Sequence, residues 1–175
     1  MSATSLWVWF AAPAGGDPDA TLTALDEIPR VRAALGSAAG GMDGFRRSHL
    51  DALATQRLMH NVPAGPRVTR FADVELVALA AQDVERAAEF AARTLGDLAT
   101  ADPELRETLR VYIREQFGAS RAARALFAHR NTVLNRLQRA EKLLPAPLEH
   151  RGVEVGLALE IVHWLGPVSG SPASA

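Results

Sequence analysis

The 175-residue chain contains no cysteine, which excludes disulfide bonds and thiolate metal sites and fits a reducing compartment. It also has no hydrophobic run approaching the ~20 residues that a membrane-spanning helix needs. Lysine and arginine are absent before Arg30, so the apolar segment 5–12 lacks the charged start of a signal peptide. A buried strand explains that segment better. We therefore expect a cytoplasmic protein with no membrane attachment.

The residues that are present can form a folded core, because 48% of the chain is hydrophobic and 22% is charged. The formal net charge is only -1, yet positive charge is concentrated in one segment. Residues 104–151 hold ten basic and five acidic side chains, whereas residues 1–103 hold nine basic and thirteen acidic ones. This asymmetry favours a local anionic partner.

The first half of the chain has the pattern of an α/β region. Aromatic or β-branched segments at residues 5–12, 30–36 and 67–71 predict three short strands. After a glycine-rich turn, a helix is expected from an N-cap at Ser48 to Met59, and Asp83 is expected to begin a later one. Three short strands make a thin sheet. We therefore expect a missing strand or a partner chain, and favour a piece cut from a longer protein.

From residue 102 onward the pattern is entirely helical. Asp102, Pro103 and Glu104 supply the cap, the fixed φ and the acidic first turn with which helices begin. A final helix is expected over residues 153–165, and the tail from residue 167 is expected to be disordered.

Between these two helices lies the layout of a helix-turn-helix. Ser120 is expected to cap a two-turn helix, and Asn131 or Thr132 to begin the next one, which extends to Leu144. At about 100° per residue, that second helix has an apolar face and a separate polar face. The residues expected to be buried in this unit are Ala123, Leu126, Phe127, Val133, Leu137, Ala140 and Leu144.

The polar face of the second helix carries residue types that suit a DNA major groove. Arginine can bond guanine, asparagine can bond adenine, and threonine can contact a phosphate or a thymine methyl group. The predicted groove residues are Thr132, Asn135, Arg136 and Arg139. Predicted phosphate contacts come from the first helix, the turn and the helix termini: Ser120, Arg121, Arg124, His129, Arg130 and Asn131.

Two alternatives stay open at this point. Arginine and asparagine are also ordinary on the solvated face of a surface helix, so periodicity alone does not establish DNA contact. His129 could fix the turn by bonding a backbone carbonyl instead of contacting phosphate.

The segment "LRETLRVYIREQFGASRAARALFAHRNTVLNRLQRAEKLL" resembles the C-terminal helix-turn-helix of the PucR/CdaR-type regulators, the purine-catabolism and sugar-diacid family. Its most specific part is the string H-R-N-T-V-x-x-R-L from His129 to Leu137. Upstream, "VRAALGSAAGGMDGFRRSHLDALATQRL" and "RVTRFADVEL" resemble that family's degenerate GGDEF-like region. The family commonly has Arg-Tyr where this chain has Leu134 and Asn135, so one expected cation is missing.

The resemblance implies a partial, degenerate GGDEF-like α/β region followed by an all-α helix-turn-helix domain. We expect the α/β region and a linker helix over residues 1–101, the helix-turn-helix domain over 102–166 and the tail over 167–175. The implied function is that of a transcriptional regulator that binds double-stranded DNA as a homodimer. Its unknown effector metabolite would be sensed outside this chain.

The alternative is a dimerisation or protein-interaction module on the same scaffold that has lost DNA contact. No enzyme, cofactor or metal site is expected. The "GGD" at residues 15–17 is followed by Pro18 and lacks the second acid of a cyclase motif, and the five histidines lack the spacing of zinc ligands. Trp7, Trp9 and Trp164 are expected in the core or at an interface.

Overall fold

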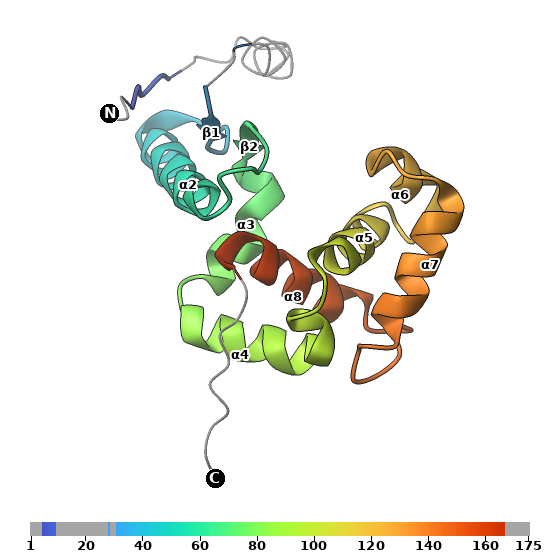
Figure 1. Ribbon diagram of the computed structural model, residues 1–175. Coiled ribbons are helices and arrows are strands. Elements are labelled where there is room, and N and C mark those ends of the chain that lie inside the picture. Colours follow the sequence, from blue (N-terminus) through green and yellow to red (C-terminus); the bar gives the residue numbers. More distant parts are fainter. Residues whose placement is uncertain (1–4, 10–27, 29–30, 167–175) are drawn as a thin grey trace. The chain divides into compact units, whose positions relative to one another are not determined.

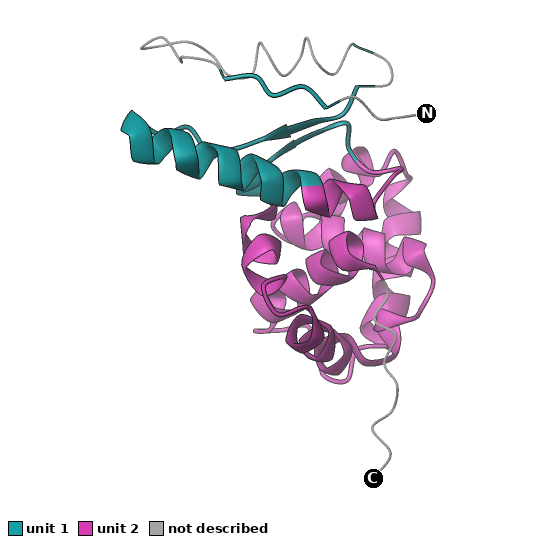
Figure 2. Ribbon diagram, turned by 90° about the vertical axis from the view of Figure 1, so that its left-hand side faces the viewer, with its two compact units in different colours: residues 1–56, 66–73 teal, residues 57–65, 74–175 magenta. Residues whose placement is uncertain are grey.

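The computed structural model describes residues 5–9, 28 and 31–166, and it divides into two compact units (Figure 2). Unit 1 contains Met1–Gln56 and Pro66–Asp73, and unit 2 contains Arg57–Gly65 and Val74–Ala175. A small α/β part is followed by helices, as predicted (Figure 1). The elements are β1 (Ala33–Leu35), α2 (Gly41–Asn61), β2 (Val68–Arg70), α3 (Phe71–Ala80), α4 (Val84–Leu95), the 3-10 helix η1 (Gly96–Ala99), α5 (Pro103–Arg114), α6 (Ala119–Ala125), α7 (Arg130–Glu141) and α8 (Gly152–Leu165).

The sheet of unit 1 consists of β1 and β2, which pair in parallel with Ala33 opposite Val68. These are two of the three predicted strands. The third prediction is wrong over residues 5–9, which form no strand and are exposed, while residues 10–12 and the "GGD" lie outside the described residues. Trp7 and Trp9 are 39% and 49% exposed, so neither belongs to a core. A strand needs a hydrogen-bonded neighbour, and among the described residues β1 and β2 pair only with each other.

Helix α2 begins seven residues before the predicted N-cap, so the prediction of a glycine-rich turn up to Ser48 is wrong. The helix starts at Gly41, where φ is +74°, and Asp43 places a carboxylate in the first turn. Negative charge there interacts favourably with the helix dipole and offsets the low helix propensity of glycine. Just before it, a Cβ on Gly36 would lie 1.9 Å from the carbonyl oxygen of Ser48. Only glycine allows the chain to pass α2 so closely.

The predicted starts of α4 and α5 are both confirmed. The Asp83 carboxylate accepts the Arg86 backbone N–H at 3.0 Å, and the Asp102 carboxylate accepts that of Glu104 at 2.8 Å. Each bond satisfies an otherwise unpaired donor at a helix N-terminus. The helix predicted from Asp83 is interrupted at Gly96, whose φ of +56° ends α4 before the short η1.

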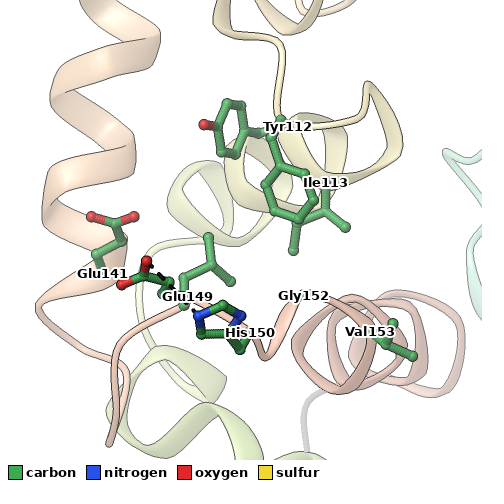
Figure 3. Close-up of a pocket in the computed structure, with 9 residues that line it drawn as sticks. Tyr112, Ile113, Glu141, Glu149, His150, Gly152 and Val153 are labelled. Atoms are coloured by element: carbon green, nitrogen blue, oxygen red, sulfur yellow. Dashed lines mark ion pairs between the residues drawn. The ribbon is translucent and has the colours of Figure 1, made fainter.

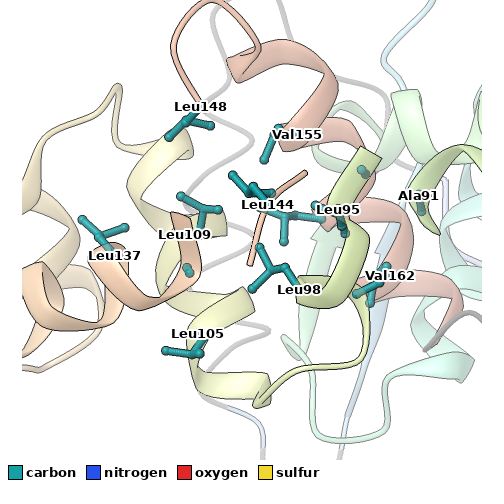
Figure 4. Close-up of a cluster of buried hydrophobic side chains, with 14 of the residues drawn as sticks. Ala91, Leu95, Leu98, Leu105, Leu109, Leu137, Leu144, Leu148, Val155 and Val162 are labelled. Carbon is teal, nitrogen blue, oxygen red and sulfur yellow. The ribbon is translucent and has the colours of Figure 1, made fainter. Parts of the chain in front are cut away.

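The core of unit 2 lies between α4, α5, α7 and α8, with α4 against α8 and α5 against both α7 and α8 (Figures 1 and 4). Leu95, Leu98, Leu109 and Leu159 are among its fully buried side chains, and Trp164 is buried as predicted. Helix α4 therefore shares a unit with the helix-turn-helix, whereas the sequence-based boundaries assigned it to residues 1–101. None of the described helices combines the length and apolarity that crossing a membrane requires.

Candidate nucleic-acid interface

Helices α5, α6 and α7 form a three-helix arrangement in which each packs against the other two (Figure 1). The apolar face predicted for α7 is confirmed, because Val133, Leu137 and Ala140 are all buried, and Leu144 is buried just beyond the helix. Leucine and valine at this spacing turn one side of α7 toward α5 and α6. The polar side is consequently left for solvent or a ligand.

The turn between α6 and α7 begins with a Schellman motif. The N–H of Ala128 donates to the carbonyl of Ala123 at 2.9 Å, and the N–H of Phe127 donates to that of Arg124 at 3.1 Å. This motif places Phe127 in the left-handed region, with φ of +50°. Phe127 is 99% exposed, so the prediction that it is buried is wrong. The left-handed conformation directs its Cβ away from the packed face of α6.

His129 is the N-cap of α7, with its Nδ1 accepting the backbone N–H of Asn131 at 3.3 Å. It therefore fixes the turn, although by accepting an N–H and not by bonding a carbonyl. The predicted cap at Ser120 is wrong, since α6 starts at Ala119 after Gly118, which makes no side-chain cap bond. Ser120 is exposed in the first turn of α6.

The four predicted groove residues have different environments. Thr132, Asn135 and Arg139 are exposed along α7. Arg136, by contrast, forms an ion pair and hydrogen bond with Glu104 at the start of α5, and its side chain is 25% exposed. Leu134, which replaces a cation common in the family, is half-buried, so it does not form an exposed apolar patch. The structure therefore leaves three of the four free to face a ligand.

The predicted phosphate contacts are all exposed, but Arg121 also has partners within the chain. Its guanidinium donates to the Glu115 carbonyl at 3.0 Å through Nε and to the Gln116 carbonyl at 3.2 Å. It also lies 3.7 Å from the Glu115 carboxylate. A cation here neutralises the negative end of the α5 dipole. Arg121 thus joins the end of α5 to α6.

Arg124, Arg130 and Arg139 keep their charges available. No carboxylate among the described residues forms an ion pair with any of the three, and all three are exposed. They come from α6, the start of α7 and its last turn, respectively. The helix-turn-helix therefore carries uncompensated positive charge on both of its helices.

A partly buried ionic network that the sequence patterns did not predict joins α5 to α8. Arg110 donates to both carboxylate oxygens of Glu107, at 2.9 and 2.8 Å, and to both of Glu160, at 3.2 Å each. The indole N–H of Trp164 also donates to Glu160, at 3.2 Å. The sequence shows that Glu107 and Arg110 are three residues apart and that Glu160 and Trp164 are four apart, so each pair can interact within its own helix. Nothing in the sequence indicates that Arg110 of α5 contacts Glu160 of α8.

This network shifts the pKa values of its members. Burial alone would raise the pKa of Glu107, but the hydrogen bond and charge of Arg110, with His163 and Arg114, bring it below the usual range. Burial, followed by the positive charge of Arg110, lowers the pKa of His163, against the effect of Glu107 and Glu160. His163 therefore favours its neutral form, with Nδ1 3.8 Å from Glu107.

An open, largely apolar hollow lies at the other end of α5 from the Glu104–Arg136 pair (Figure 3). It is lined by Tyr112 and Ile113 from the end of α5, by Phe117 from the turn after it, and by Gly152 and Val153 from the start of α8. Glu141, Glu149 and His150 also line the hollow and are exposed, and His150 Nε2 lies 4.0 Å from the Glu149 carboxylate. In the described part of the chain, no three His, Cys, Asp or Glu side chains cluster as metal ligands would.

Comparison with protein families agrees with this geometry. Residues 105–161 match the model of the PucR C-terminal helix-turn-helix domain. The match begins within the first turn of α5 and ends within α8. Residues 1–58 match that of a GGDEF-like domain. Neither the curated proteins nor the solved structures include a match to the chain.

Proposed function

We propose that this protein is a transcriptional regulator of the PucR/CdaR type that binds double-stranded DNA through α6 and α7. The proposal is supported by the match of residues 105–161 to the PucR helix-turn-helix domain and of residues 1–58 to a GGDEF-like domain. The observation that carries the proposal is a set of exposed arginines on the helix-turn-helix that form no ion pair with any described residue: Arg124, Arg130 and Arg139. Cations left unpaired on a motif of this shape suit a polyanion.

In this proposal α7 lies in the major groove. Thr132, Asn135 and Arg139 are three and four residues apart, so they share one side of the helix. Arg139 would bond guanine and Asn135 adenine, and these contacts would select the sequence. Arg124 and Arg130, with Ser120, Asn131 and Arg121, would hold phosphates and set the position of the protein on the duplex. Arg136 would join them only after leaving Glu104.

The proposal extends to assembly and location. A reader of this type engages two half-sites about one helical turn apart, so we propose a homodimer. The effector would be a small metabolite sensed outside this chain, and the protein would act in the cytoplasm. No catalytic role is proposed.

A second candidate function is a protein-interaction module without DNA contact. It is favoured by the pairing of Arg136 with Glu104 and by the bonds of Arg121 to the end of α5, which remove two predicted cations. The three arginines that form no ion pair within the described part of the chain favour DNA instead.

The test is binding of the chain to fragmented genomic DNA over a series of salt concentrations. The slope of log K against log[salt] is expected to correspond to about 0.9 per phosphate contacted. Arg139→Ala is expected to weaken binding about tenfold or more and to abolish the selection of particular fragments. Arg93→Ala removes the same charge from an exposed site on α4 and is the matched control. Equal binding by all three proteins, or none at low salt, would favour the interaction module.

A further inference from the structure

Phe127 occupies a position that neither burial nor backbone preference explains. Its side chain is 99% exposed, and its φ of +50° is one that residues with a Cβ adopt at a cost. The equivalent position of a Schellman motif is usually glycine. A phenylalanine at this position adopts a strained backbone conformation that glycine would adopt without strain, and it exposes a large apolar ring to water.

Phe117 provides the internal comparison. It too has positive φ, +58°, in the turn after α5. Its ring, however, is packed edge-on against Tyr112 at 5.6 Å between centroids and covers Gly152. Phe117 thus makes contacts within the chain that account for its presence, and the described structure provides none of this kind for Phe127.

The surroundings of Phe127 are basic. Arg124 precedes it by one helical turn and Arg130 follows it by three residues, and both are exposed without an ion-pair partner in the described structure. His129 and Asn131, also exposed, start α7. An apolar protein partner would have to desolvate these cations, whereas a nucleic acid would neutralise them.

We propose that Phe127 contacts the 5-methyl group of a thymine at the edge of the major groove, so that the protein prefers thymine at that position. The inference rests on the proposed function. Phenylalanine is among the apolar side chains that recognise this methyl group, which in the major groove distinguishes thymine from adenine, guanine and cytosine. The phosphate contacts of Arg124 and Arg130 would hold the turn against the groove.

The experiment uses the full chain and one pool of duplex fragments that it selects, synthesised either with thymine or with uracil, which lacks the methyl group. Wild type is expected to bind the thymine form more tightly, by about fourfold for each methyl group contacted. Phe127→Ala is expected to bind thymine DNA about fourfold more weakly than wild type does. On uracil DNA the variant and wild type are expected to have the same affinity. Its thymine-to-uracil affinity ratio would therefore be about fourfold below that of wild type.

Two further variants keep the result interpretable. Phe127→Gly is expected to show the same DNA defect with an unchanged or higher melting temperature, because glycine adopts positive φ without strain. Phe117→Ala removes the other phenylalanine with positive φ among the described residues and is expected to keep the wild-type ratio.

An unchanged ratio in Phe127→Ala, with Arg139→Ala still defective, overturns the thymine contact and leaves the proposed function standing. A change of oligomeric state in Phe127→Ala with an unchanged ratio also overturns it, in favour of a contact between copies. Absence of DNA binding by wild type overturns both proposals.

Discussion

Arg136 of α7 is ion-paired with Glu104 in the first turn of α5, across 32 residues of sequence. The pair joins the second helix of the helix-turn-helix to the helix that supports it, and it offsets the charge of one predicted groove arginine. Arg139, three residues further along α7, has no such partner among the described residues. The two arginines, equivalent in the sequence pattern, should therefore differ in their effect on DNA binding.

Glu104→Gln is expected to increase DNA affinity about two- to fivefold, because it releases Arg136 and removes a negative charge close to it. The salt slope should rise by about 0.9, the value for one additional phosphate contact. Stability should fall by less than about 1 kcal/mol, since the Glu104 side chain is largely exposed. Glu141→Gln removes an equal charge from an exposed site on α7. If both variants gain affinity equally, the pair with Arg136 does not restrain binding.

Arg139→Lys is expected to separate affinity from selectivity. Lysine keeps the positive charge, so the salt slope should remain close to that of wild type, but it lacks the planar fork that bonds guanine through two hydrogen bonds. Sequencing of the DNA fragments retained by each protein should show a broader set for the lysine variant. Retention of the wild-type set would show that Arg139 contacts phosphate and not a base.

Arg110→Met is expected to lower the free energy of unfolding by about 3–5 kcal/mol, because it leaves two carboxylates in the α5–α8 interface without their shared cation. The measurement is urea unfolding followed by circular dichroism. Arg114→Met is the matched control: its side chain is about half exposed and lies 3.7 Å from Glu160, so its loss should cost less than about 1 kcal/mol. Equal losses would mean that the network is not what joins these helices.

His163→Gln is expected to make stability less sensitive to mild acid. Burial, and secondly the positive charge of Arg110, lower the pKa of His163 in the folded protein, and the opposing effect of Glu107 and Glu160 is smaller. As the pH falls, His163 is therefore protonated in the unfolded chain before it is protonated in the folded protein. The contribution of neutral His163 to the free energy of unfolding is complete above about pH 6.5, which is the pKa of histidine in the unfolded chain. It is lost as the pH falls from that value toward the lower pKa of the folded protein. Glu107, whose pKa is lowered, loses its contribution only below its ordinary carboxylate range.

The measurement is the free energy of unfolding at about pH 7.5 and 5.5. The decrease between the two should be smaller in His163→Gln than in wild type, while His150→Gln, which alters an exposed side chain, should behave as wild type does. The same decrease in all three proteins would exclude His163 as its source.

Much of the helical half follows from the sequence because its signals are local. Asp83 and Asp102 each cap a helix by accepting a backbone N–H from a residue two or three positions further along the chain. The buried face of α7 follows from the spacing of its apolar residues. The H-R-N-T-V-x-x-R-L string lies within the residues that match the PucR C-terminal helix-turn-helix domain, as its resemblance indicated. Predictions of this kind depend on residues adjacent in the chain or one turn apart, so they do not require knowledge of the tertiary structure.

Only the tertiary structure could determine which distant residues meet. Arg136 and Glu104 are 32 residues apart, and Arg110 and Glu160 are 50 apart, so their pairing depends on how the helices pack. The same is true of residues 5–9, whose apolar pattern predicts a strand but which pair with none of the described strands. Phe127 is apolar and was expected inside, but the Schellman turn directs its ring into solvent. Composition and periodicity describe what a residue prefers, whereas partners and exposure depend on the packing of the whole domain.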